Sequence, residues 1–189
     1  MTTVVLLTSG SPLILFLHLT DEVIAMADAF LQIAGIPGES TDSKHTNWIE
    51  LENYSINASQ TVTDAMSHGM RSTGRVHLGD FSFSKKIDSS SAKIFTALCK
   101  GQPIKKVVLN ACRANEQKTV FLKIEMSNVY FTHYSHSGPG VDGAHESITF
   151  SPGQLVITYS PEDHNTGTPK GNIPGGWDQE KNKAITAVA

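Results

Sequence analysis

Three histidines close together in the chain are the side chains that come nearest to a metal site. His133, His136 and His145 are accompanied by two carboxylates, Asp142 and Glu146. Imidazole and carboxylate groups together bind zinc in many proteins. The spacing matches no zinc signature, and histidines around a loop are more often solvent-facing polar residues. We therefore predict no metal and no cofactor, and keep a small metal-dependent enzyme built on this loop as an alternative.

A second possible chemistry is acid–base catalysis by Glu50 and Glu52, which share one face of an alternating segment. Such a pair needs one carboxyl group whose pKa is raised by its surroundings. The solvated outer face of a strand accounts for both carboxylates without that requirement. The sequence also contains no G-x-S-x-G motif, no phosphate-binding glycine loop and no H-E-x-x-H pattern. We predict that the protein is not an enzyme.

The elements that must position these side chains are predicted to be mostly strands. Alternation of apolar and polar residues predicts a first strand that ends before Gly35. It predicts further strands over 48–60, 75–86, 107–111, 120–126 and 148–159. The last strand is expected to be interrupted at 151–153, where Pro152 indicates a bend or an edge. Segments 61–74 and 136–140 are expected to be loops, the first of them long enough to serve a partner.

A single helix is predicted over 92–100. Its apolar residues recur at helical spacing, Asp88 and the serines after it offer N-caps, and Gly101 followed by Pro103 ends it. One helix among roughly six or seven strands, without βαβ alternation, predicts a mainly β sandwich or barrel. The tail after Pro161 is polar, although Trp177 indicates that part of it docks.

Composition limits the remaining possibilities. The chain has 189 residues, which suits one domain, and its formal net charge of −3 lacks the basic excess of a nucleic-acid binder. Cys99 and Cys112 are too far apart for a C-x-x-C pair, and each lies in a predicted element, where a small buried thiol is the common outcome. A cytosolic folding compartment is the simpler interpretation, and a disulfide between the two is left open.

The first residues differ from the rest of the chain. Residues 4–19 are strongly apolar but are broken by a short polar stretch, which makes them too short for a membrane span. No Lys or Arg precedes Lys44, whereas a secretory signal needs a positive start. We interpret 1–25 as an extension outside the fold, with Met26 as the working start of a single domain over 26–189.

An ordered set of short motifs carries more information than the spacing of any single residue. The motifs lie at 28–33, 36–40, 44–45, 50–51, 54–55, 81–85, 87–88 and 175–178, the last being Gly-Gly-Trp-Asp. In this order they resemble the Hcp (haemolysin-coregulated protein) family, the inner-tube subunits of type VI secretion systems. The chain departs from the family's pattern at Tyr54 and Ile56, where family members commonly carry Trp and a related apolar residue.

The resemblance implies both a fold and an assembly. The implied fold is a two-sheet antiparallel β-barrel or sandwich with one flanking helix, in which six copies form a ring and the rings stack into a tube. A contracting sheath would eject this tube, tipped by a spike protein, and small effector proteins would ride in its lumen with the ring as their chaperone. The protein would assemble in the cytoplasm and leave through the secretion machine, without a cleaved signal peptide or stable membrane insertion.

Two sets of residues acquire candidate roles from this resemblance and from strand alternation. Ser55, at a matched position, is expected to lie opposite the side that carries Tyr54 and Ile56 and to line the lumen. The loop 61–74 is expected to join stacked rings. Its candidate stacking residues are Asp64, Met66, His68, Met70 and Arg71.

Two alternatives to a structural tube subunit remain besides the metal-dependent enzyme. The first is a secreted monomeric β-sandwich that binds carbohydrate or lipid, with its N-terminal segment processed after Ala25. The second keeps the family but makes this copy a carrier of effectors more than a structural part of the tube.

Overall fold

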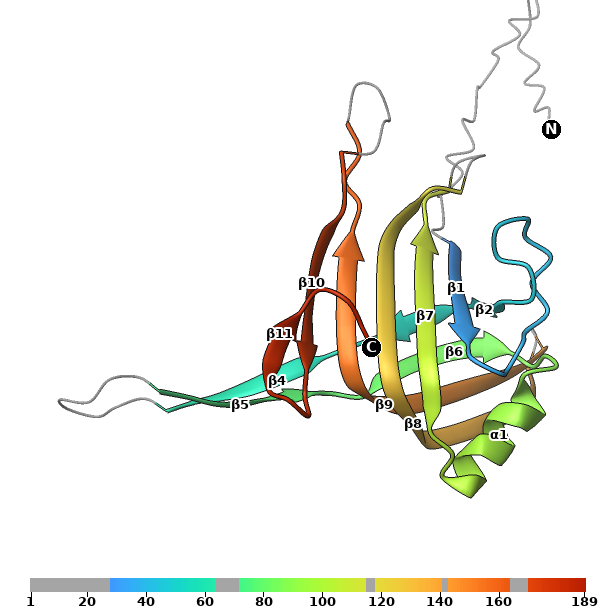
Figure 1. The fold of residues 1–189 in the computed structure, drawn as a ribbon. Coiled ribbons are helices and arrows are strands. Elements are labelled where there is room, and N and C mark those ends of the chain that lie inside the picture. Colours follow the sequence, from blue (N-terminus) through green and yellow to red (C-terminus); the bar gives the residue numbers. More distant parts are fainter. Residues whose placement is uncertain (1–27, 64–71, 115–117, 141–142, 164–169) are drawn as a thin grey trace, which may run out of the picture.

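The computed structural model describes residues 28–63, 72–114, 118–140, 143–163 and 170–189, and most of them are in strands (Figure 1). The strands are β1 Asp28–Ile33, β2 Ile49–Leu51, β3 Asn53–Ser55, β4 Ala58–Thr63, β5 Ser72–Leu78, β6 Phe81–Lys86, β7 Ile104–Cys112, β8 Val120–Gly140, β9 Gly143–Tyr159, β10 Ile173–Asp178 and β11 Lys183–Ile185. The described residues contain one helix, α1, at Ser91–Lys100. All pairings between these strands are antiparallel, so the predicted mainly β fold with one helix is confirmed.

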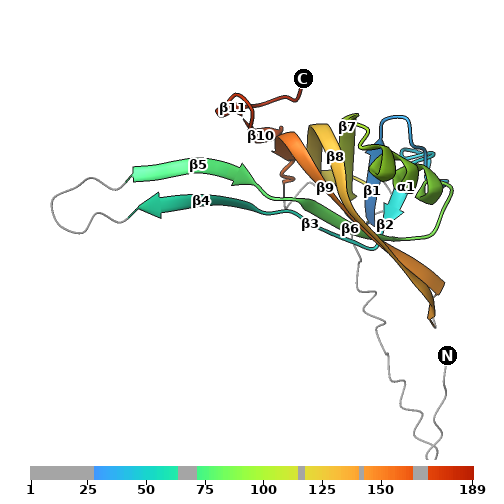
Figure 2. The same ribbon diagram turned by 90° about the horizontal axis from the view of Figure 1, so that it is seen from below.

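The strands form two layers that share the long β8–β9 hairpin. The first layer has the order β11-β10-β9-β8-β7-β1-β2. In the second layer β3 pairs with β6, and β6 pairs with the first half of β9. Strands β4 and β5 form a separate hairpin that extends away from both layers (Figures 1 and 2). Buried side chains from both layers and from α1 form one hydrophobic cluster.

Strand β9 changes partners near the proline noted in the sequence. Its residues 145–150 pair with β6, and its residues 154–159 pair with β10. Pro152 lies between these two sets of pairs, so its missing N–H group interrupts neither the β6 ladder nor the β10 ladder. The strand is continuous through this point. The interruption predicted at 151–153 is therefore wrong, and the proline marks a change of layer instead.

The alternation of β6 explains which face of the second layer is buried. Phe81 and Phe83 are almost fully buried, whereas Ser82 and Ser84 are partly exposed. Phe81 stacks on Phe150 of β9 with 4.9 Å between the ring centroids. Full burial of a Phe side chain contributes about 1.5–3 kcal/mol, so these rings hold β6 firmly on β9.

Helix α1 packs one side on the core, although two of the apolar residues at helical spacing, Phe95 and Cys99, lie outside the buried side. Ile94 and Ala97 are buried in the hydrophobic cluster, whereas Phe95 is half exposed. The helix ends at Gly101, whose φ of +59° is a left-handed conformation that favours glycine. The N–H group of Gly101 donates to the carbonyl of Leu98 and satisfies one of the last carbonyls of the helix. The predicted helix is confirmed.

The two cysteines have different environments. Cys112 is buried in β7, and burial raises the pKa of its thiol. Cys99 is exposed, because it lies on the side of α1 that faces away from the core, so its predicted burial is wrong. Both thiols are free.

Several predicted boundaries are also wrong. Residues 61–63 end β4, 72–74 begin β5, and 136–140 belong to β8, although all three were expected in loops. The segment 48–60 is divided among β2, β3 and the start of β4. The missed strand ends consist mainly of Ser, Thr, Gly, His and Pro, and their described side chains are largely exposed. They carry no apolar alternation because neither face is covered by the core.

The tail docks through β10 and β11, as Trp177 indicates. Trp177 is partly buried against the core and pairs with Leu155 of β9. Its neighbour Gly176 lies so close to β9 that an added Cβ atom would be 2.3 Å from the Leu155 carbonyl oxygen. Glycine is therefore required for this strand pairing.

Candidate assembly surfaces

The β4–β5 hairpin is the most prominent surface feature of the chain. Among the described residues its strands pair only with each other, and both views show it extending away from the two layers (Figures 1 and 2). A two-stranded hairpin is at best marginally stable alone in water, so a partner surface would stabilise it. The predicted stacking residues lie between its two strands in the chain and outside the described residues: Asp64, Met66, His68, Met70 and Arg71.

Ser55 lies in β3 with its side chain exposed. Its neighbour Tyr54 stacks on Phe81 with 6.1 Å between the ring centroids, and burial raises the pKa of the Tyr54 hydroxyl group. Ile56 is also packed against the core. Because successive side chains of a strand point to opposite faces, Ser55 faces away from the core.

Ser55 is part of a larger polar face of the second layer, which we call the hydroxyl face. Directly paired residues share a face of a sheet, so the register extends this face from Ser55 to Ser82, Thr149 and His133. The hydroxyl groups of Ser82 and Thr149 are 3.2 Å apart. The members are Asn53, Ser55, Ser82, Ser84, Lys86, His133, Ser135, Ser137, His145, Ser147 and Thr149, all exposed or partly exposed. None of them is a large apolar side chain.

The histidines of the candidate metal loop are divided between the two faces of the β8–β9 hairpin. His133 and His145 lie on the hydroxyl face, whereas His136 is opposite Glu146 on the other face. Glu146 is buried and is held by other partners. Among the described residues no three His, Cys, Asp or Glu side chains are placed to hold a metal ion, and Asp142 lies outside them. The geometry of the described residues does not favour the metal-dependent alternative.

The two carboxylates of the candidate acid–base pair have different partners. The Glu50 carboxylate accepts a hydrogen bond of 2.8 Å from the hydroxyl group of Ser40. A Glu52 carboxylate oxygen lies 2.9 Å from Nδ1 of His145, which joins β9 to the segment between β2 and β3. Each carboxylate therefore has a structural partner of its own.

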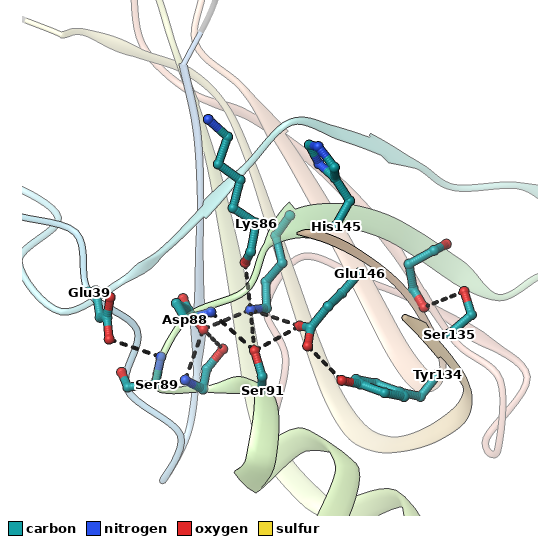
Figure 3. Close-up of polar contacts among 12 residues, drawn as sticks. Glu39, Lys86, Asp88, Ser89, Ser91, Tyr134, Ser135, His145 and Glu146 are labelled. Carbon is teal, nitrogen blue, oxygen red and sulfur yellow. Dashed lines mark hydrogen bonds and ion pairs between the residues drawn. The ribbon is translucent and has the colours of Figure 1, made fainter. Parts of the chain in front are cut away.

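A buried polar network fixes the start of α1 between β6, β8 and β9. The Lys85 side chain is fully buried, and its Nζ atom lies 2.7 Å from Asp88, 3.0 Å from Glu146 and 3.0 Å from the hydroxyl oxygen of Ser91. Figure 3 shows Asp88, Ser91 and Glu146 gathered at the start of the helix, with Tyr134 on the far side of Glu146. We call these five residues the lysine network.

Hydrogen bonds complete the lysine network around Glu146. The Ser91 hydroxyl group donates to one oxygen of Glu146 at 2.9 Å, and the Tyr134 hydroxyl group donates to the other at 2.6 Å. Burial, together with this bond to the carboxylate, raises the pKa of Tyr134 to about 12. The sequence analysis missed this network, although Lys85 lies on the same face of its strand as Phe81 and Phe83.

A second polar network holds the loop before β2 against β1 and β7. His45 is buried, and its ring stacks on Phe30 with 4.3 Å between centroids. Its Nδ1 atom lies 2.9 Å from Asp42, and its Nε2 atom lies 3.1 Å from the side-chain nitrogen of Asn110. The ammonium group of Lys118, 3.0 Å from Asp42, and then the His45 ring hold the pKa of the Asp42 carboxyl well below its usual range. In the sequence His45 is visible only as part of the motif at 44–45, and nothing there indicates these partners.

Comparison with known proteins gives consistent results. Residues 30–159 match the family described as "Type VI secretion system effector, Hcp". The chain is 28% identical over 157 residues to Protein hcp1 of Pseudomonas aeruginosa, which covers 82% of this chain and 96% of that protein. A solved structure described as a type six secretion system protein has a TM-score of 0.79 and 29% identity, and the match covers 85% of this chain and 100% of that one. Hcp1 from Salmonella typhimurium has a TM-score of 0.70 and 28% identity, covering 86% and 100%.

The fold and these matches together define a structural tube protein of a bacterial secretion machine. The chain belongs to the Hcp family of type VI secretion, as its ordered motifs predict. This is a family of secreted structural proteins and not a family of enzymes. None of the described residues forms a helix long and apolar enough to cross a membrane.

Proposed function

We propose that six copies of this chain form a ring, that the rings stack into a tube, and that the hydroxyl face lines the lumen. The observation that carries this proposal is the position of Ser55 within an exposed or partly exposed polar face in which most side chains are Ser or Thr. Head-to-tail interfaces that close on themselves generate rings, and ring assemblies are characteristic of the Hcp family. A ring also covers sheet edges that a monomer would leave open.

The composition of the hydroxyl face suits the wall of a channel for proteins. Large exposed apolar patches bind partners or cause aggregation, whereas small hydroxyl side chains provide hydrogen bonds without strong burial of apolar surface. Most of the large exposed apolar residues of the described chain lie elsewhere, for example Phe95 on α1 and Ile173 on β10, whereas Tyr130 pairs with Ser151 at the end of this face. A cargo protein held by such a wall would bind weakly and could leave again. In this proposal Ser55 contacts small effector proteins in the lumen.

The β4–β5 hairpin supports the stacking part of the proposal. It extends away from the two layers, and a hairpin of this kind needs a surface to pack against. In the stacked tube that surface belongs to the next ring, and Asp64, Met66, His68, Met70 and Arg71 would contact it. The sheath proteins would surround the tube, and a spike protein would cap it.

The ring is tested by native mass spectrometry of the full chain at micromolar concentration, together with negative-stain microscopy. A species of six subunits that forms rings supports the proposal. A stable monomer at every salt and protein concentration tried refutes it and returns attention to a monomeric binding module.

The lumen is tested by labelling a cysteine at Ser55, in a Cys99→Ser background that removes the exposed thiol. We expect a small maleimide to label tubes and separated subunits at similar rates. A maleimide on a bulky polymer should label tubes far more slowly, because the lumen restricts its entry. Equal labelling of tubes and separated subunits by the bulky reagent would place Ser55 on the outer surface.

A further inference from the structure

The β4–β5 hairpin joins the rest of the chain through a narrow base. Strand β3 leads into β4 through residues 56–57, and β5 leads into β6 through residues 79–80. The N–H group of Gly79 donates to the Asn57 carbonyl at 2.9 Å, and a Cβ atom added to Gly79 would collide with the Asn57 side chain. The two connecting segments therefore lie in close contact. The direction of the hairpin depends on the contacts made by the residues of β4 and β5 next to this base.

The turn between β10 and β11 contacts this base directly. The guanidinium group of Arg75 in β5 donates to the main-chain carbonyls of Gln179 and Glu180. The N–H group of Leu78 donates to the side-chain oxygen of Gln179 at 2.7 Å. These three hydrogen bonds join the hairpin to a segment about a hundred residues further along the chain.

The same turn is firmly attached to the first layer. The N–H group of Gln179 donates to the Gly153 carbonyl at 3.0 Å, where β9 changes layers. Asp178 is buried and accepts bonds of 2.8 Å from the side chain of Gln154 and from the N–H group of Lys181. The Lys181 N–H bond is the first cause of the lowered pKa of Asp178. The turn is thus a fixed point to which the hairpin is tied.

Apolar packing holds the end of β5 next to the base, where Leu78 is buried in the core and Val76 packs against it. A cleft lined by Arg75, Val76, His77, Gln179 and Glu180 lies beside the hydrogen bonds that join the hairpin to the turn. Arg75 is exposed, and its described partners are two carbonyl oxygens rather than a carboxylate. A planar guanidinium group can donate to two such oxygens in a fixed geometry, which a lysine ammonium cannot reproduce.

We propose that the β10–β11 turn is a clasp that sets the direction of the β4–β5 hairpin, with Arg75 and Gln179 as its positioning residues. The inference rests on the proposed role of the hairpin in joining stacked rings. At about 3.3 Å per residue, the seven residues of β5 span about 23 Å. A change of about 10° at the base moves the far end of the strand by about 4 Å, roughly the length of a small side chain. A released hairpin would therefore miss its place on the next ring.

The experiment compares full-length wild type with Arg75→Ala, Arg75→Lys and Gln179→Ala. Native mass spectrometry measures rings, and negative-stain microscopy measures how many rings are stacked. We expect ring formation to change less than twofold, and stacking to fall by about tenfold in each variant, because hydrogen bonds from a charged donor or to a buried site are lost. Lys170→Ala is the matched control, because it removes an exposed lysine paired with Asp163 away from the clasp.

Hydrogen exchange adds a readout that does not depend on assembly. In separated subunits, Gln179→Ala should raise the exchange rate of the Leu78 amide, since that amide donates to the Gln179 side chain. An unchanged rate would overturn the contact. Normal stacking by Arg75→Ala would overturn the role of the clasp. Normal stacking by Arg75→Lys would overturn the need for a guanidinium group, because a positive charge at this position would then be sufficient.

A further variant separates failure of the clasp from failure of the hairpin role. Replacing Met66 and Met70 by serine alters the segment between β4 and β5 and leaves the clasp residues intact. If this variant stops stacking while Arg75→Ala stacks normally, only the clasp is wrong. If both variants stack normally, the proposed role of the hairpin in stacking is wrong as well.

Discussion

Replacement of Lys85 by methionine is the sharpest test of how the buried polar contacts hold this subunit. The substitution keeps an unbranched side chain of similar length but removes the positive charge that lies 3.0 Å from Glu146 and 2.7 Å from Asp88. Lys85 is fully buried and Glu146 is 1% exposed, so water cannot take the place of the ammonium group. Removal of one partner of a buried ion pair costs about 3–5 kcal/mol, because the other charge is left without compensation.

That magnitude is a large part of the stability of a domain, which is about 5–15 kcal/mol in total. Urea unfolding followed by the fluorescence of Trp48 and Trp177 measures it. With a slope of about 1–3 kcal/mol per M of urea, the midpoint should fall by at least about 1 M. All variants must be compared at the same protein concentration, since assembly of subunits raises the apparent stability.

A second substitution, Glu146→Gln in the Lys85→Met background, tests whether the charges of Lys85 and Glu146 stabilise each other. Glutamine removes the uncompensated charge and still accepts the hydrogen bond from Tyr134. The double variant should therefore be more stable than Lys85→Met alone. If the losses in unfolding free energy caused by the two substitutions simply add, the double variant is the least stable of all. That result would refute the view that the two charges act as a pair.

Three further predictions concern other parts of the fold. The pKa of Tyr134 is raised to about 12 from 10.0, so its contribution to stability is complete below pH 10 and is lost as the pH rises from 10 to 12. Tyr134→Phe should show a smaller alkaline loss of stability than wild type in thermal melts over that range. Gly176→Ala should destabilise the protein by about 1–3 kcal/mol through collision with β9, whereas Gly175→Ala, with open space around its Cβ position, should cost much less. The pKa of Asp42 is lowered from 3.8, so Asp42→Asn should be less stable than wild type at pH 7, and the difference should shrink as the pH falls below 3.8.

The strands that could be predicted from the sequence are those with one buried apolar face. Phe81 and Phe83 alternate with serines and locate β6, and helical spacing locates α1. The distal halves of β8 and β9 could not be located in the same way. There the hydroxyl face carries serines, and the opposite face carries the polar residues Tyr134, His136 and Glu146. Polar residues on both faces remove the apolar alternation on which the prediction depends.

The candidate sites also differ in how much of their geometry the sequence predicts. Alternation shows that Ser55 lies opposite Tyr54, and it could have shown that Lys85 lies on the core side of β6. It could not show that Glu146 compensates Lys85, because that contact depends on the pairing of two strands far apart in the chain. The hydrogen bonds of Arg75 to the β10–β11 turn could not be predicted from the sequence, because its partners are main-chain carbonyls.

The polar contacts of this subunit are placed where the hydrophobic core cannot fix direction. Burial of apolar surface favours compactness but is non-directional, so it leaves the angles of helices, loops and hairpins loosely determined. Lys85 fixes the start of α1, His45 fixes the loop before β2, and Arg75 ties the projecting hairpin to the turn after β10. In a tube every ring repeats the same angular error, and the errors accumulate along the stack. A subunit of such an assembly therefore gains more from a few directional contacts at its projecting segments than from additional apolar burial in its core.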